Sequence, residues 1–170
     1  MTRKNHANRR GATILEFTLI GIALVFVFIS FFEMARGMWT YQTLAYAVRE
    51  GTRYAVMHGK DCVSPNTCQV TVGQIVGVIQ SAGVGLDPNN TTVTLTPASG
   101  SATSDTITNL LTNTTTWPPT SSYTPGQQVT ISAVYPFRTI LAMFWVGAGG
   151  PLTDSQTFNL GATSTEGIEY

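Results

Sequence analysis

Reactive and metal-binding side chains are scarce in this sequence. Only two histidines and two cysteines occur among its 170 residues, and charged residues make up 11% of the chain. No Ser/His/Asp spacing, phosphate-binding loop or His/Glu cluster is present. Cys62 and Cys68 are two ligands short of a tetrahedral metal site. The sequence therefore predicts no enzyme, no bound cofactor and no metal.

Basic charge is scarce beyond the N-terminus. Four of the nine basic side chains lie within residues 1–11, and only Lys60 and Arg138 follow Arg53. Without residues 1–11 the chain carries five basic and nine acidic side chains, a formal charge of −4. No basic stripe remains that could neutralise nucleic-acid phosphates, so nucleic acid is not expected as a partner.

One long apolar run follows the basic N-terminus. Residues 12–32 contain a single charged side chain, Glu16. A helix of that length is about 30 Å long, enough to cross the hydrocarbon core of a bilayer. The basic residues ahead of it predict a cytoplasmic N-terminus, which places the rest of the chain outside the cytoplasm.

Two simpler interpretations of this run are a cleaved signal peptide and a plain anchor. The run is longer than an ordinary signal-peptide core, and no small-x-small cleavage site closes it. In a plain anchor Glu16 would have no role, although a carboxylate in a spanning segment costs on the order of 3 kcal/mol. That cost favours a function for Glu16.

Helical periodicity continues past the apolar run. Residues 33–58 contain no proline, and this predicts that one rod continues through them. Glu33 and Arg36, and likewise Glu50 and Arg53, have the spacing that lets oppositely charged side chains meet on a helix. We therefore expect an amphipathic second half that a domain must cover. Its expected apolar stripe is Met34, Met38, Tyr41, Ala45, Val48 and Ala55.

Two parts of this rod resemble a known family. A basic leader, then Gly11 and Ala12, then Glu16 as the fifth residue counted from Ala12, resembles the start of a type IV prepilin. Further along, Ala47-Val48-Arg49-Glu50-Gly51-Thr52-Arg53-Tyr54-Ala55 resembles the most recognisable phrase of the TadE-like family. These are pilin-like pseudopilins of the tight-adherence, or Flp pilus, machinery. The resemblance is strong over residues 11–58 and weaker beyond.

The resemblance implies specific site residues. A prepilin peptidase would cut between Gly11 and Ala12. Glu16, with Phe17 beside it, would set the register of assembly by pairing its carboxylate with the new amine of a neighbouring subunit. The positions of the TadE-like phrase are Arg49, Glu50, Gly51, Arg53 and Tyr54.

The resemblance also implies a function and a location. The chain would be a minor pilin or pseudopilin for assembly of a tight-adherence type IVb pilus, held in the inner membrane by one span before it enters an extracellular pilus. Its partners would be the prepilin peptidase, other pilin or pseudopilin subunits, the inner-membrane assembly platform and the lipid bilayer. The alternative function is an uncleaved, single-span binding domain outside the cytoplasm.

The expected fold is α+β and type IV pilin-like. Residues 1–11 form the leader, residues 12–58 the long helix, and residues 59–170 a small antiparallel β-sheet domain with a short second helix. We expect that second helix at residues 70–82, and strands at residues 91–96, 127–135 and 152–163. Pro136 should end the strand at residues 127–135. Phe158 and Leu160 should face inward on the strand at residues 152–163, and an acidic tail should follow residue 164.

Three further segments have open interpretations. Residues 97–126 are rich in Ser, Thr, Asn, Gly and Pro, so they are expected as a long insertion, either a solvated connector or a partner-binding loop. Residues 140–146 are apolar throughout but too short to span, and form either core or an exposed contact. Cys62 and Cys68 are expected to form a disulfide outside the cytoplasm, with free thiols as the alternative.

Overall fold

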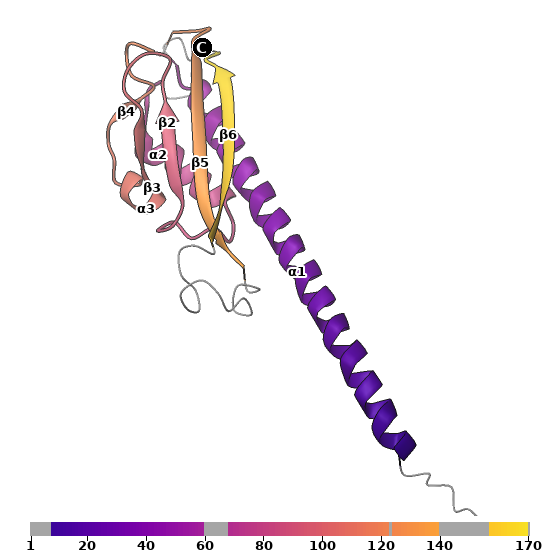
Figure 1. Ribbon diagram of the computed structural model, residues 1–170. Helices are drawn as coiled ribbons and strands as arrows, with labels where there is room; N and C mark the ends of the chain where they lie inside the picture. Colours follow the sequence, from indigo (N-terminus) through magenta and orange to yellow (C-terminus); the bar gives the residue numbers. More distant parts are fainter. Residues whose placement is uncertain (1–7, 60–67, 123, 140–156, 170) are drawn as a thin grey trace, which may run out of the picture.

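The computed structural model describes residues 8–59, 68–122, 124–139 and 157–169. A single long helix carries a small domain at one end (Figure 1). The elements in chain order are α1 (Asn8–Val56), β1 (Val70–Thr71), α2 (Val72–Ala82), β2 (Thr92–Thr96), β3 (Thr103–Thr106), α3 (Ile107–Leu110), β4 (Thr116–Trp117), β5 (Gln128–Arg138) and β6 (Thr157–Gly167).

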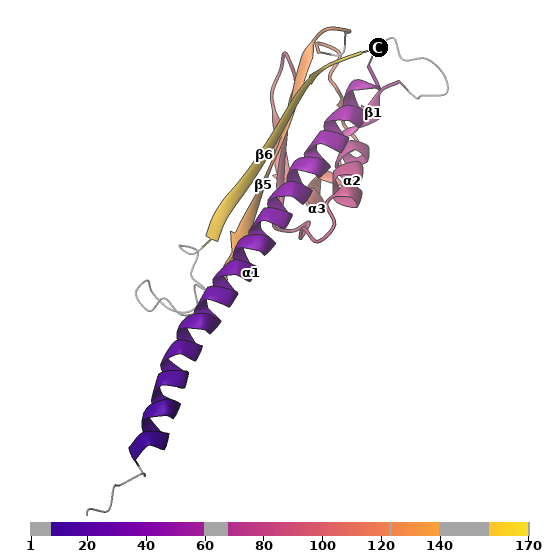
Figure 2. The same ribbon diagram turned by 90° about the vertical axis from the view of Figure 1, so that its right-hand side faces the viewer.

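Helix α1 has two halves in different surroundings. Its 49 residues correspond to about 74 Å of helix. The N-terminal half projects from the domain, while the C-terminal half lies between α2 on one side and β5 and β6 on the other (Figure 2). Among the described residues, α1 is the helix that is long and apolar enough to cross a membrane, and none of its most apolar stretch is buried.

The buried stripe of α1 differs from the predicted one. Met34, Met38 and Tyr41 are exposed, with Met34 72% accessible. The contact face consists of small and apolar residues about one turn apart, namely Leu44, Ala47, Val48, Gly51, Thr52, Ala55 and Val56. The prediction was wrong for Met34, Met38 and Tyr41 because another face of α1 meets the end of the sheet at this level, where a β-carbon at Gly37 would lie 3.6 Å from the Phe137 ring.

The main sheet is antiparallel, with strand order β3-β2-β5-β6. Alternate residues of β5, namely Val129, Ile131 and Ala133, are buried against the helices, as the period-two pattern predicted. Pro136 does not end this strand, which continues to Arg138. Beyond Val134, β5 pairs with β6 alone, and a strand with one free side tolerates a residue that lacks an N–H donor.

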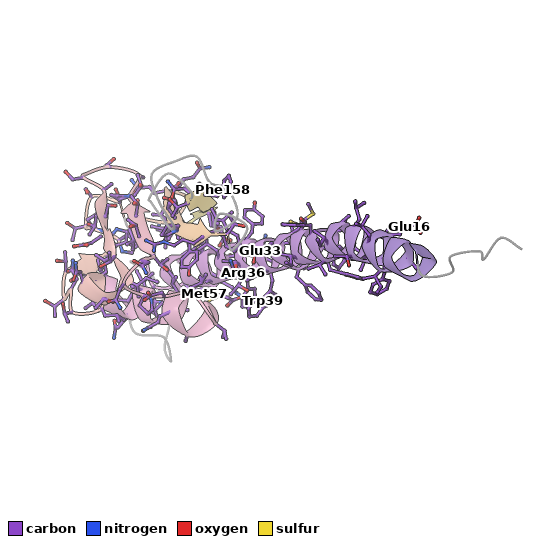
Figure 3. The ribbon with its side chains drawn as sticks, turned by 60° about the horizontal axis from the view of Figure 1, so that its bottom comes forward. Glu16, Glu33, Arg36, Trp39, Met57 and Phe158 are labelled. Carbon is purple, nitrogen blue, oxygen red and sulfur yellow. The ribbon has the colours of Figure 1, made fainter. Side chains whose placement is uncertain are left out.

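Strand β6 also corrects two predictions. It runs to Gly167, so the first half of the expected acidic tail, residues 165–167, is paired with β5, where Gln128 lies opposite Gly167. Phe158 is not in the core but 63% exposed, whereas Ala162 on the same face is buried. Phe158 lies opposite Phe137, at the end of the sheet nearest the projecting N-terminal half of α1 (Figure 3). The described part of the chain ends close to the end of α1, where Glu169 N donates to the Val56 carbonyl at 3.3 Å.

The segment 97–126 is not a solvated connector. It contains β3, α3 and β4, and it buries Ile107, Leu110 and Trp117. Its backbone also supports α2, because the N–H groups of Val72 and Gly73 donate to the carbonyls of Thr115 and Asn113 at 2.9 and 3.0 Å. These bonds satisfy donors that the first turn of a helix leaves unpaired. Thr71 and Gln74 complete the same helix start as a reciprocal capping box.

The α+β, pilin-like fold class predicted from the sequence is confirmed. A long apolar N-terminal helix is joined to small antiparallel sheets and a short helix, and α2 lies within the expected segment. The apolar segment 140–146 and Cys62 lie outside the described residues. The disulfide with Cys68 therefore stays a prediction.

Candidate functional site

The first part of the candidate site is the N-terminal half of α1 that projects from the domain, residues 13–32, which we call the bare half. Glu16 and Phe17 are both exposed on it, and Phe17 is among the most accessible apolar side chains, at 80%. Figure 3 shows the Glu16 carboxylate near the far end of the helix, well away from the domain. Gly11 and Ala12 belong to the first turns of α1. Because glycine is a poor helix residue by about 1 kcal/mol, this turn is among the easiest in α1 to open.

Hydroxyl groups in the bare half have partners within the helix itself. Thr18 Oγ1 donates to the Ile14 carbonyl at 2.8 Å, and Ser30 Oγ donates to the Phe26 carbonyl at 2.9 Å. These bonds leave neither hydroxyl unsatisfied in an apolar medium. Glu16 is thus the one ionisable side chain among residues 13–32.

The TadE-like phrase lies where α1 crosses α2. A β-carbon at Gly51 would lie 2.4 Å from Ile79 Cγ1, and one at Gly83 would lie 3.6 Å from the Ala47 β-carbon. Ala47, Gly51 and Ala55 are one turn apart and buried. Small residues on this line let the two helices approach closely, so the sequence requirement at Gly51 is one of packing.

The polar positions of the phrase have different surroundings. Thr52 is fully buried and donates to the Val48 carbonyl at 2.8 Å. The Tyr54 ring lies 4.3 Å from the His58 ring, and His58 Nδ1 donates to the Tyr54 carbonyl at 2.6 Å. Arg49 and Arg53 are exposed. The expected ion pair between Glu50 and Arg53 is not formed between these two described residues.

The other expected ion pair of α1, between Glu33 and Arg36, does form, at the base of the domain. Arg36 Nη2 lies 3.3 Å from Glu33 Oε2, and the Glu33 side chain is only 9% exposed. The same Nη2 donates to the Arg138 carbonyl, and the guanidinium lies 4.6 Å from the centroid of the Phe137 ring. Arg36 therefore connects α1 to the end of β5 by an ion pair, a hydrogen bond and a cation–π contact.

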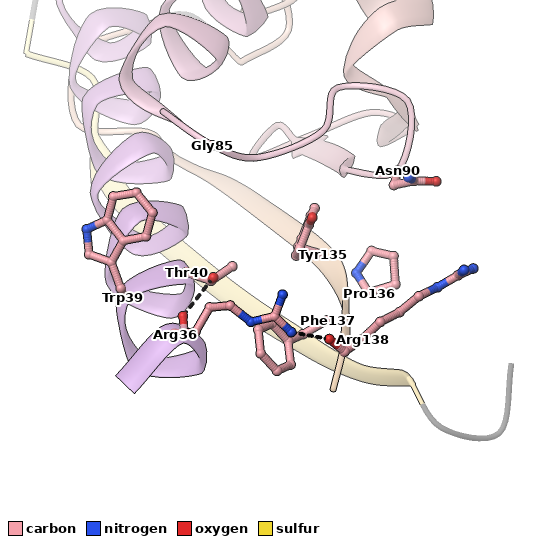
Figure 4. Close-up of a pocket in the computed structure, with 9 residues that line it drawn as sticks. All are labelled: Arg36, Trp39, Thr40, Gly85, Asn90, Tyr135, Pro136, Phe137 and Arg138. Atoms are coloured by element: carbon pink, nitrogen blue, oxygen red, sulfur yellow. Dashed lines mark hydrogen bonds between the residues drawn. The ribbon is translucent and has the colours of Figure 1, made fainter. Parts of the chain in front are cut away.

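A pocket opens beside Arg36. Its volume is about 370 Å³, and Figure 4 shows the side chains that line it. Arg36, Trp39 and Thr40 come from α1, Gly85 and Asn90 from the loop between α2 and β2, and residues 135–138 from β5. A β-carbon at Gly85 would lie 3.6 Å from the Trp39 ring, so the indole forms one wall close to the loop.

Sequence reasoning missed the partners of the residues that it identified. Ile79, which meets Gly51, lies in a segment that was expected only as a short second helix, with no partner assigned. Phe137 and Arg138, which meet Arg36, follow a proline that was expected to end their strand. Arg138 did carry one usable signal, since it is one of only two basic residues after Arg53.

The fold and these residues define a class: a small pilin-like α+β domain on one long, half-bare apolar helix. Within that class, the model of the family described as "TadE-like protein" matches residues 11–53, so the resemblance inferred from the sequence is confirmed over this segment. The match covers Gly11, Glu16 and the phrase as far as Arg53, and indicates a protein related to the tight-adherence pilus. No curated protein and no solved structure matches the chain.

Proposed function

We propose that this chain is a minor pilin or pseudopilin of a tight-adherence type IVb pilus, cut by a prepilin peptidase between Gly11 and Ala12. The observation that carries the proposal is Glu16, an exposed carboxylate on a bare apolar helix half, five residues beyond Gly11. The TadE-like match over residues 11–53 supports the same assignment.

The chemistry of assembly follows from the cost of a charge in hydrocarbon. An ionised carboxylate buried without a partner is strongly disfavoured, and a nearby ammonium offsets that cost. Cleavage before Ala12 creates such an ammonium at the start of the helix. The Glu16 carboxylate of one subunit then pairs with the Ala12 amine of its neighbour, which favours assembly and fixes the axial register.

The expected location is the inner membrane. Residues 1–11 stay cytoplasmic, residues 12–32 cross the bilayer, and the domain lies outside the cytoplasm. The assembly platform then moves the subunit into the pilus. The domain is large for a subunit that builds a shaft, which favours an initiating, tip or accessory position at low copy number.

Mass spectrometry of the N-terminus tests the proposal. Full-length chain co-expressed with a prepilin peptidase should begin at Ala12, and chain expressed without the peptidase should keep its leader. Gly11→Val should block processing because a side chain next to the scissile bond obstructs the enzyme. Gly21→Val is the matched control, since a β-carbon at Gly21 would meet nothing within 4 Å. An intact leader in the native host would instead support the uncleaved binding domain.

A further inference from the structure

Apolar side chains stay exposed on α1 beyond the bare half. Met34 is 72% and Met38 is 55% exposed, and they follow Phe31, which is 69% exposed. Residues three and four apart are neighbours on the surface of a helix, so these three side chains lie along one face. The apolar surface of α1 therefore continues past residue 32 and up to the base of the domain.

A strand that is distant in sequence adds an apolar side chain at the same level. Phe158 of β6 is 63% exposed, although it shares the face of the sheet that α1 covers. Its register partner is Phe137, whose ring would lie 3.6 Å from a β-carbon at Gly37. Gly37 lies between Met34 and Met38 along the helix. These three exposed side chains, Met34, Met38 and Phe158, thus come from two elements that meet at the base of the domain (Figure 3), and we call them the basal patch.

The chemistry of the basal patch suits an apolar partner. Its three members carry no charge, and the acidic side chain nearest to them in sequence, Glu33, is buried and paired with Arg36. Large apolar side chains that gather at the surface of a folded domain mark a contact with a partner or a membrane. The patch offers no group that would recognise a charge, so its partner must be apolar at the point of contact.

The position of the basal patch along α1 identifies that partner. If residues 12–32 fill the hydrocarbon core, Met34 and Met38 lie about 3 and 9 Å beyond its edge. The headgroup layer is roughly 5–8 Å thick on each side of a bilayer. Phe158 lies at the level of Gly37, between the two methionines. The patch therefore spans the headgroup layer, and the bilayer is the apolar medium already beside it.

We propose that the basal patch rests on the surface of the bilayer, with Met34, Met38 and Phe158 among the headgroups and the upper acyl chains. An apolar side chain gains free energy when it leaves water for such a medium. Because the patch lies on one side of α1, the contact holds that side of the domain towards the membrane. The inference rests on the single-span anchoring given under Proposed function, but on neither cleavage nor polymerisation.

Photo-crosslinking of the full chain in phosphatidylcholine nanodiscs tests the contact. Benzoylphenylalanine replaces Phe158, and mass spectrometry after irradiation measures the fraction of chain that carries a phospholipid adduct. Phe17, 80% exposed on the bare half, is the positive reference. Tyr46 is the matched control, an aromatic side chain that is 55% exposed but lies about 21 Å beyond residue 32. The adduct fraction at Phe158 should exceed that at Tyr46 about tenfold or more, as expected for an apolar side chain that leaves water. The same probe at Met38 should also form lipid adducts.

Further arms separate the bilayer from other partners of the patch. Phosphatidylglycerol nanodiscs should give the same adduct fraction at Phe158, because the patch is uncharged, and adducts that form only with this anionic lipid would overturn the proposal. Crosslinks from Phe158 to residues 140–156 or to a second copy of the chain, in place of lipid, would overturn it as well. Lipid adducts at Phe17 with no more at Phe158 than at Tyr46 defeat the basal patch alone. An absence of lipid adducts at Phe17 would show that the bare half does not span, so the anchoring and the patch would fail together.

Discussion

A β-carbon added to Gly51 would lie 2.4 Å from Cγ1 and 2.8 Å from Cδ1 of Ile79. Ile79 of α2 is fully buried in the hydrophobic core, so its side chain has little room to move. This single contact connects the most recognisable phrase of the sequence to the packing of the domain on its helix.

Gly51→Ala should destabilise the domain. Overpacking in a core costs about 1–3 kcal/mol, which exceeds the roughly 1 kcal/mol that alanine gains over glycine inside a helix. The measurement is the free energy of unfolding of the full chain in detergent micelles. Gly77→Ala in α2 is the control and should be neutral or stabilising, because its β-carbon would meet only Leu111 Cδ2, at 3.9 Å. A double-mutant cycle with Ile79→Ala should show that the two substitutions couple, and strict additivity would contradict the contact.

Glu16→Ala should abolish incorporation while leaving processing intact. The variant has no carboxylate to meet the amine of a neighbouring subunit, but its peptidase site is unchanged. Processing is followed by the mass of the chain, and incorporation by labelling of isolated pili. Thr18→Ala is the control, since it removes another polar side chain from the same bare half and its hydroxyl bonds only within the helix. Normal pilus number and normal labelling in Glu16→Ala would refute the register role.

Arg36→Ala should loosen the base of the domain. It removes the ion pair with Glu33, the hydrogen bond to the Arg138 carbonyl and the contact with the Phe137 ring. Because Arg36 is partly exposed, we expect a loss of about 1–2 kcal/mol. Amide hydrogen exchange should rise at Phe137 and Arg138 and stay unchanged in the middle of β5. Arg53→Ala, which lies in no ion pair between described residues, should change neither. Equal amide hydrogen exchange at Phe137 and Arg138 in the two variants would show that Arg36 does not hold the end of β5.

Asp105 should have a pKa below its ordinary value of 3.8, first because the Asn109 side chain bonds it and then because the Thr106 N–H does. The distances to Asp105 Oδ1 are 2.9 and 2.7 Å. A lowered folded-state pKa means that this carboxylate contributes stability above about pH 4, and that the contribution is lost as the pH falls through the lowered value. NMR titration should show a higher pKa for Asp105 in Asn109→Ala. Asn90 bonds Asp87 and not Asp105, so Asn90→Ala is the control and should leave the pKa of Asp105 unchanged.

Local patterns predicted the parts of the fold that are set by local chemistry. Alternation in β5 identified its buried face, and α2 and β2 lie within the segments 70–82 and 91–96 that were expected for them. The same rules failed where a distant segment decides the outcome. Pro136 stays within a strand because β2 begins only at Thr92, opposite Val134, and Phe158 is exposed although it is paired with Phe137 of β5. Neither circumstance can be read from the residues beside them.

Composition was misleading for residues 97–126. Their Ser, Thr and Asn side chains suggested solvation, yet three apolar residues there are buried and the backbone carbonyls complete the start of α2. Hydrogen bonds of this kind come from the main chain, so they leave no trace in side-chain composition. For the candidate site, the sequence indicated Gly11, Glu16 and the Arg36–Glu33 pair, but the pocket required the long-range meeting of α1 with β5.

The two hydroxyl groups that bond back into the bare half of α1 have a further consequence. Thr18 and Ser30 make the same hydrogen bonds whatever surrounds the helix, since donor and acceptor lie on one turn. On transfer from lipid tails to a packed protein interior, this segment would exchange one set of hydrocarbon neighbours for another and break no polar contact of its own. Glu16 is the one ionisable side chain in this stretch, so its free energy would change most on the transfer. The rest of the segment would be nearly indifferent to whether lipid or protein surrounds it.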